Sequence, residues 1–181
     1  MVCGRNHSAM VTAEGRVYCW GAASFGRLGH ADAKKKQSVP LAVPFFSTIP
    51  VHSLSSGDFH MLALGHNCAV YSWGYGAEGQ CGHGNTFHLH TPRQIDFFNS
   101  LSVVRLACGA SWSMAITKSG DLYGWGYNEA TASPLTLMGA KEGEAAVESI
   151  GGESPMREWA QHRLHLVPSP DLVGGALGRL G

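Results

Sequence analysis

Histidine and cysteine are the residue types in this chain that could do chemistry, since 10 histidines and 5 cysteines occur among 181 residues. The densest histidine group is His83, His88 and His90, in the segment HGNTFHLH. Zinc sites usually draw on a helical H-x-x-x-H pair or on paired cysteines. This spacing fits neither pattern, so we interpret these side chains as loop histidines and predict no metal site.

The cysteines and the glycine-rich segments show no other reactive arrangement. The five cysteines are scattered and include no C-x-x-C pair, which favours buried free thiols in a reducing compartment. The segment GASWS at 109–113 lacks the last glycine of a G-x-S-x-G nucleophile turn, and no phosphate-binding loop is present. We therefore predict no catalytic residue and no cofactor site. The cysteines are Cys3, Cys19, Cys68, Cys81 and Cys108.

An internal repeat accounts for the placement of most of these residues. The segments 3–21, 56–74 and 108–126 align without a gap, and their tryptophans are 53 and 52 residues apart. Such a fixed period is typical of a repeat architecture. Four columns are identical in all three copies: Gly4/Gly57/Gly109, Tyr18/Tyr71/Tyr123, Trp20/Trp73/Trp125 and Gly21/Gly74/Gly126.

Each copy predicts an antiparallel β-hairpin. The strands are rich in β-branched and aromatic residues, and Glu14-Gly15, Asn67-Cys68 and Ser119-Gly120 provide the turns. Consecutive apolar residues in each first strand indicate burial on both faces. The expected strands are 7–13, 16–21, 60–64, 69–74, 113–117 and 121–126.

Further strands complete each repeating unit. A glycine-rich link follows the hairpin, and extended segments with a proline come next, at 38–43 and 90–95. Short strands at 51–57 and 103–109 then lead into the next copy. Units of about four short strands with a period near 50 residues are typical of a β-propeller.

The pattern C-G-x-x-H-S-x-A-x-T-x-x-G-x-V-Y-x-W-G, followed by G-x-L-G-H, resembles the RCC1 repeat, named after the regulator of chromosome condensation. The resemblance covers residues 1–128 and implies an all-β, incomplete propeller of two to three blades. Matching residues in the first copy are His7, Ser8, Thr12, Gly15, Val17, Tyr18, Trp20, Gly21, Gly26, Leu28, Gly29 and His30. In the second copy they are Gly57, His60, Val70, Tyr71, Trp73, Gly74, Gly79, Gln80, Gly82 and Gly84.

The third copy departs from the pattern after Asn128, where no glycine-rich link follows. Residues 129–181 mix Gly, Ala, Ser, Pro and Glu without a period, so we expect an irregular or disordered tail. One short helix is expected near 155–166, with Ser154 as its N-cap and Pro155 at its first position.

Charge and hydropathy limit the partners and the compartment. The 13 basic and 13 acidic residues give a net charge of zero, so nucleic acid is not an expected partner, and the run Lys34-Lys35-Lys36 is interpreted as a solvated loop. No stretch of eighteen apolar residues could span a membrane, and Met1–His7 has no apolar signal core. We expect a cytoplasmic protein, with the nucleus as the alternative.

The repeated polar and aromatic columns are expected to be structural. His7 and His60 should bridge backbone groups between strands, since buried polar groups need partners. The repeated tyrosines and tryptophans should form the core rather than stack on bases. No residue of a binding site can be identified from these columns.

The function expected from the resemblance is that of a protein–protein interaction module, as a piece or shortened product of a larger adaptor or regulatory protein. The alternative is guanine-nucleotide exchange on a Ran-like small GTPase. The resemblance implies a protein partner, with a small GTPase and a component of the ubiquitin pathway as the two kinds to consider.

Overall fold

The fold is known from a computed structural model that describes residues 1–31, 36–128 and 133–140. These residues form three antiparallel sheets, each of four strands consecutive in the chain. The first sheet contains β1 (Val2–Cys3), β2 (His7–Val11), β3 (Val17–Gly21) and β4 (Gln37–Ala42). The second contains β5 (Val51–Ser56), β6 (His60–Gly65), β7 (Val70–Gly74) and β8 (Leu89–Gln94). The third contains β9 (Val103–Cys108), β10 (Trp112–Thr117), β11 (Leu122–Asn128) and β12 (Ser133–Ala140).

The three predicted hairpins are confirmed. β2 pairs with β3, β6 with β7 and β10 with β11, each in an antiparallel register. The middle hairpin turns without a glycine, at Cys68, whose φ is 63°. The extended segments predicted at 38–43, 51–57, 90–95 and 103–109 are also strands, so the period of the sequence is the period of the sheets.

Helical structure in the described residues is limited to three short 3-10 turns, η1 (Ser24–Gly26), η2 (Pro44–Ser47) and η3 (Asp96–Ser100). Across the same residues, no helix has the length and apolar character needed to cross a membrane. The helix expected near 155–166 lies outside the described residues.

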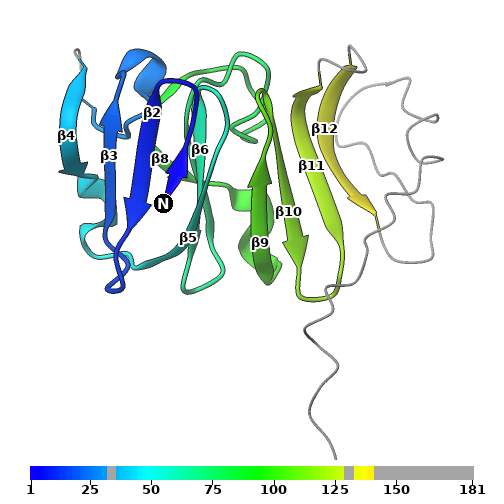
Figure 1. The fold of residues 1–181 in the computed structure, drawn as a ribbon. Helices are drawn as coiled ribbons and strands as arrows, with labels where there is room; N and C mark the ends of the chain where they lie inside the picture. The colour runs from blue at the N-terminus through cyan, green and yellow to red at the C-terminus, as the bar shows by residue number, and fades with distance from the viewer. Residues whose placement is uncertain (32–35, 129–132, 141–181) are drawn as a thin grey trace, which may run out of the picture.

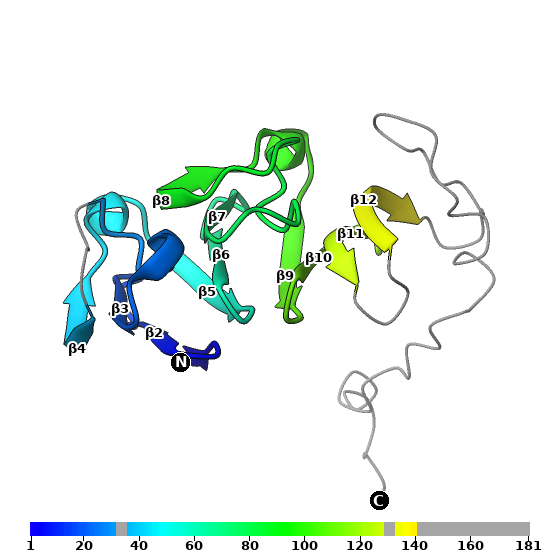
Figure 2. The same ribbon diagram turned by 90° about the horizontal axis from the view of Figure 1, so that it is seen from above.

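The three sheets stand side by side along an arc, as Figures 1 and 2 show. The first strands of neighbouring sheets meet: β1 and β2 contact β5, and β5 and β6 contact β9. A backbone ladder joins the same places, because Arg5 N donates to Asp58 O at 3.2 Å and Asp58 N donates to Ala110 O at 3.1 Å. Each sheet therefore packs its face on the next, in the manner of propeller blades.

Burial of the first hairpin strands follows from this stacking. All six residues of β6 are buried, whereas buried and partly exposed residues alternate along β10. In β2 the buried residues are His7 and Ala9. Burial on both faces, which we expected in every copy, is thus found only in the middle sheet, because only that sheet has a described neighbour on each side.

The repeated tryptophans connect neighbouring sheets. Trp73 Nε1 donates to Arg27 O at 3.0 Å, and Trp125 Nε1 donates to Gln80 O at 2.8 Å. Arg27 and Gln80 occupy the same position in the glycine-rich links of the first and second units. Each indole therefore reaches from its own sheet into the link of the preceding one, and both indoles are buried.

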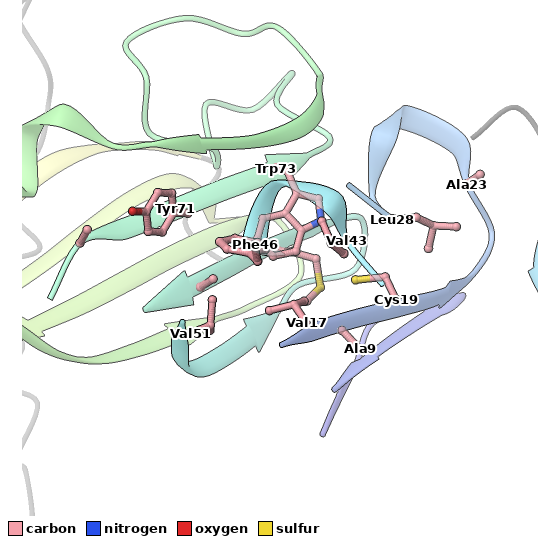
Figure 3. Packing of buried hydrophobic residues seen from close by; sticks show 13 residues of the cluster. Ala9, Val17, Cys19, Ala23, Leu28, Val43, Phe46, Val51, Tyr71 and Trp73 are labelled. Atoms are coloured by element: carbon pink, nitrogen blue, oxygen red, sulfur yellow. The ribbon is translucent and has the colours of Figure 1, made fainter. Parts of the chain in front are cut away.

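Apolar side chains from two units surround each indole. Trp73 lies in a cluster with Leu28, Val43 and Phe46 of the first unit (Figure 3). The Phe46 and Trp73 rings are 5.6 Å apart between centroids. The equivalent cluster around Trp125 contains Ile95 and Phe98 of the second unit.

The third sheet extends further along the chain than the sequence pattern indicated. We expected the repeat signal to end at Asn128, yet residues 133–140 form β12 and pair with β11 from Leu122 to Asn128. An edge strand needs only backbone donors and acceptors opposite its neighbour, so it can form without the repeat's side-chain pattern. The remaining tail, 141–181, lies outside the described residues.

We expect Trp73→Ala to lower the free energy of unfolding by about 3–5 kcal/mol, the usual loss for truncating a buried aromatic side chain. The variant also leaves Arg27 O without its donor. Trp20→Ala is the matched control, because Trp20 occupies the same column but is only partly buried and has no hydrogen-bond partner within the described ranges. Thermal melts followed by circular dichroism should show the larger loss for Trp73. Equal losses would contradict a stabilising role for the contact between sheets.

We expect the purified chain to be marginally stable and to self-associate. Val39 and Leu41 are 62% and 45% exposed on β4, an edge strand of the first sheet, and exposed apolar edges recruit other chains. Val39→Lys combined with Leu41→Glu should reduce the associated fraction in size-exclusion chromatography with light scattering. His66→Lys combined with Asn67→Glu, at an exposed turn, is the control. A monodisperse monomer at every concentration would contradict the expectation.

Candidate functional site

The histidine column lies between sheets. His60 Nε2 is 2.9 Å from Ser113 Oγ of the next sheet, and Ser113 Oγ donates to Gln80 O at 3.0 Å. Because the hydroxyl proton points at that carbonyl, the His60 Nε2–H donates to Ser113 Oγ. His7 Nε2 likewise lies 3.1 Å from both Met61 Sδ and Ser56 Oγ. The structural role predicted for both histidines is found, but the partners differ from our expectation, since the rings contact side chains of the next sheet rather than backbone groups.

Two glycine columns follow from the same packing. A Cβ at Gly4 or Gly57 would overlap the ring of His7 or His60 and approach a carbonyl of the next sheet. Gly21 has a φ of 110°, a conformation that side chains with a Cβ rarely adopt. These two glycine columns are thus explained by close packing between sheets and by a backbone conformation that suits glycine.

The three histidines considered for metal binding occupy different environments. His83 Nε2 lies 2.8 Å from Ser72 Oγ, while His88 Nδ1 accepts from Gly76 N at 3.2 Å. His90 is exposed on β8. Within the described ranges, no group of three or more His, Cys, Asp or Glu side chains is arranged to hold a metal ion.

All five cysteines are free thiols, and their exposure varies. Burial raises the pKa of the Cys19 and Cys81 thiols to about 12, so neither is a nucleophile at neutral pH. Cys3 is exposed, so the expectation of buried thiols does not hold there. Of the lysine run, Lys34 and Lys35 lie outside the described residues and Lys36 is exposed.

One group of aromatic side chains lies in the links and loops rather than in the repeated hairpin strands. Phe25 of η1 contacts Tyr75 and His88, with ring centroids 5.0 and 5.1 Å apart, and Phe59 at 6.2 Å. His88 stacks on Tyr75 at 4.7 Å. These residues come from the link after β3, the loop between β5 and β6, and the link after β7. We call this group of four rings the aromatic cluster.

Arginine side chains lie on the aromatic cluster. The Arg27 guanidinium is 4.6 Å from the centroid of Phe59 and 5.6 Å from that of Phe25, within cation–π range. Its Nε donates to Ser24 O at 2.8 Å. Burial lowers the pKa of Arg27, although a guanidinium stays charged in proteins. Arg5 lies 5.8 Å from the Phe59 centroid and forms an exposed ion pair of 3.9 Å with Asp58.

Phe25 has an unusual backbone conformation. Its φ of 62° is in the left-handed region, and the side chain remains 41% exposed. A bulky residue in such a conformation costs on the order of 1–3 kcal/mol and often marks a functional position. The aligned residue of the second link, Glu78, has no positive φ. The strain is therefore specific to the first link and holds an aromatic ring at the surface.

Sequence reasoning did not detect the aromatic cluster, because two of its members, Phe25 and Phe59, are not aromatic in the following units. The positions aligned with Phe25 and Phe59 hold Glu78 and Ser111 in the following units. A search for repeated columns passes over such residues. The available signal was the opposite one, namely aromatic residues in links and loops that break the repeat pattern.

Three stacked four-stranded sheets, with tryptophan contacts from each to the one before, define part of a β-propeller. A family model described as the regulator of chromosome condensation (RCC1) repeat matches residues 14–64 and 69–116, and a second model of that description matches 103–130. The chain belongs to the RCC1 repeat family.

Relatives with this repeat differ widely in the whole proteins that carry it. The chain is 38% identical over 128 residues to the human E3 ubiquitin-protein ligase HERC2, covering 70% of this chain and 3% of HERC2. It is 36% identical over 128 residues to the ultraviolet-B receptor UVR8 of Arabidopsis thaliana, covering 70% of this chain and 29% of UVR8. The chain thus spans well under two thirds of these relatives.

A solved structure supports the fold. Prp20p from Saccharomyces cerevisiae superposes with a TM-score of 0.67 at 21% identity, covering 78% of this chain and 37% of Prp20p. At this identity the similarity bears on the propeller fold and not on the surface residues.

The buried histidines predict a pH dependence of stability. Burial, with a smaller contribution from Arg27, lowers the pKa of His7 to about 4, and burial with the neighbouring His7 lowers the pKa of His60 to about 3. In the unfolded chain both protonate near a pKa of about 6.5. The unfolded state therefore binds more protons as pH falls from about 6.5 toward 3, and the free energy of unfolding decreases over that window.

Denaturant titrations between about pH 7.5 and 4.5, across the unfolded-state pKa, measure this dependence. We expect His60→Gln to make it shallower, because one titrating group is removed. His66→Gln, at an exposed turn, is the control and should leave the dependence as in the parent. A His60→Gln variant with an unchanged slope would contradict the role assigned to this buried imidazole.

Proposed function

We propose that this chain is a protein–protein interaction module and that it has no catalytic role of its own. The observation that supports this most is the aromatic cluster. It brings residues of three loops together on a rigid frame of stacked sheets, and it includes exposed apolar surface at Phe25. Recognition sites are commonly built on loops that a rigid scaffold positions.

Histidine and cysteine, the residue types that could act chemically, give no support to a catalytic function instead. The column residues His7 and His60 and the thiols of Cys19 and Cys81 are buried in the packing between strands and sheets. Low histidine pKa values arise here from burial at structural positions, which also perturbs ionisable groups away from active sites. The exposed, non-repeated side chains therefore remain as the groups available to a partner.

The partner and the compartment belong to the same proposal. HERC2 is an E3 ubiquitin-protein ligase, so a component of the ubiquitin pathway is one kind of partner to test. Prp20p has binding properties toward Gsp1p and histones, and nucleotide exchange on a Ran-like GTPase is our alternative function for this chain. We propose the cytoplasm as the compartment, with the nucleus as the alternative.

Affinity capture followed by reconstitution tests the interaction function. The full chain should retain specific proteins from a cell extract, and at least one of them, purified separately, should bind the chain saturably in an equilibrium titration. A parallel capture with Trp73→Ala, which destabilises the stacking of the sheets, should retain less of the bound protein. Failure of every purified candidate to bind saturably would contradict the proposed function.

We expect no acceleration of nucleotide release from a Ran-like GTPase. The described residues form three sheets. We expect an exchange surface of a propeller to span more blades than these. Release of labelled GDP, measured with substoichiometric chain and with an intact exchange factor as positive control, checks this. Clear catalytic acceleration would favour the alternative function.

A further inference from the structure

We propose that His52 and His66 together bind a divalent transition-metal ion, with Zn²⁺ as the ion to test. His52 is on β5 and His66 directly follows β6, so the two side chains come from neighbouring strands of the second sheet. Both histidines are exposed. Their ring centroids are 5.5 Å apart, and the ring planes are nearly perpendicular, at 79°. This site lies outside the aromatic cluster and goes beyond the proposed interaction function.

The backbone holds the two histidines close together. The register of β5 and β6 shifts between Val51 and Ser53, so His52 is the extra residue of a β-bulge. His66 N donates to Pro50 O at 3.1 Å, which continues the pairing past the end of β6. Backbone pairing is therefore present on both sides of His52, and the two side chains are brought together before any ion binds.

The separation of the rings suits chelation. Zn–N bonds of about 2.0–2.1 Å at tetrahedral angles put the ring centroids of two ligating imidazoles roughly 5 Å apart. Within the described ranges, neither imidazole has a side-chain hydrogen bond, whereas His60 and His83 each contact a serine hydroxyl. The nitrogens of the exposed pair are thus available, and small side-chain rotations can turn one nitrogen of each ring toward an ion. Imidazole is a preferred ligand of zinc, copper and nickel.

The third sheet shows that the fold does not require this pair. The aligned positions there hold Val104 and Lys118. The register of β9 and β10 shifts at the same place, and Lys118 N donates to Ser102 O at 2.7 Å, as His66 N does to its own partner. The same backbone therefore forms without either imidazole, so packing of the repeat does not explain why two histidines meet here.

The neighbouring charges admit a cation. Val51 N donates to Gly15 O at 3.0 Å, so the turn of the first hairpin lies beside the start of β5. Glu14 and Arg16 flank Gly15, and their opposite charges leave that turn without a net charge. Two neutral imidazoles add no charge of their own. They supply two ligands, and water can occupy the remaining coordination positions of the ion.

Sequence patterns do not reveal this pair, because the two histidines are 14 residues apart and lie in different strand segments. Zinc motifs are recognised by short spacings within one segment. The histidines that the sequence brought to attention, His83, His88 and His90, are close in the chain instead. The pairing of β5 with β6 brings His52 and His66 together.

Two substitutions taken from other units of this chain each remove one ligand. His52→Val introduces the residue of the third unit, and His66→Ala introduces the residue of the first unit, Ala13. Both variants should therefore fold as the parent does. His90→Gln, at an exposed histidine of β8, and Cys3→Ser, at an exposed thiol, are the matched controls.

Isothermal titration calorimetry of the full chain with zinc chloride measures the affinity, and NMR of the imidazole nitrogens locates the ion. We expect one tightly bound ion per chain, with shifts at His52 and His66. Each single variant should weaken binding at least about tenfold, since even the loss of a group that supports a ligand costs about 10–100-fold. The double variant should lose little more, because chelation needs both rings. Both controls should bind as the parent does.

Thermal melts without zinc should match the parent for both variants, which separates the loss of a ligand from the loss of the fold. An affinity that neither variant changes would overturn the inference and show an adventitious ion only. Independent, additive losses in the double variant would also reject chelation, as would binding by the parent weaker than about 1 mM. Loss of the ion in a control variant instead would place it elsewhere. None of these results bears on the proposed interaction function, which the capture experiment tests.

Discussion

The hydrogen bond from each buried indole to the link of the preceding sheet is the interaction on which the described structure depends. Trp73 and Trp125 each stand on the face of one sheet and donate to a carbonyl of another. A buried carbonyl without a donor is costly, and an indole has a single N–H, so the contact sets both the distance and the register between sheets. The apolar clusters around the two tryptophans then form where two units meet.

The polar contacts between sheets follow the same arrangement. His60 donates to Ser113 of the next sheet, and the Ser113 hydroxyl in turn donates to the carbonyl of Gln80. That carbonyl also accepts from Trp125, so serine and tryptophan donate to one backbone carbonyl and the histidine is linked to it through the serine. Stacked units of this kind gain stability mainly from nearest-neighbour interfaces. The neutral state of the buried imidazoles is part of that interface.

A frame held together by repeated columns leaves side chains of its links and loops at the surface, Phe25 among them. The aromatic cluster combines the link of the first unit with the loop and link of the second, so it forms only because the two sheets are stacked. The Arg27 carbonyl holds Trp73 while its side chain lies over Phe59. One residue thus accepts a hydrogen bond from a buried indole through its backbone and packs on the aromatic cluster through its side chain.

The amino-acid sequence by itself determined the period, the hairpins, the four-stranded units and the structural columns. These features depend on local signals: turn residues at fixed offsets, β-branched and aromatic strands, and a tryptophan every 52 or 53 residues. The recurrence of a whole-unit pattern also indicated the family. The tertiary structure decided which faces are buried, that β12 completes the third sheet, and that the histidines bond to the next sheet. It also assembled the aromatic cluster, whose members lie between positions 25 and 88 of the chain and of which Phe25 and Phe59 are not aromatic in the following units. Contacts of that kind depend on how one sheet stacks on another and on the left-handed backbone of Phe25, and neither is encoded in a local pattern of residue types.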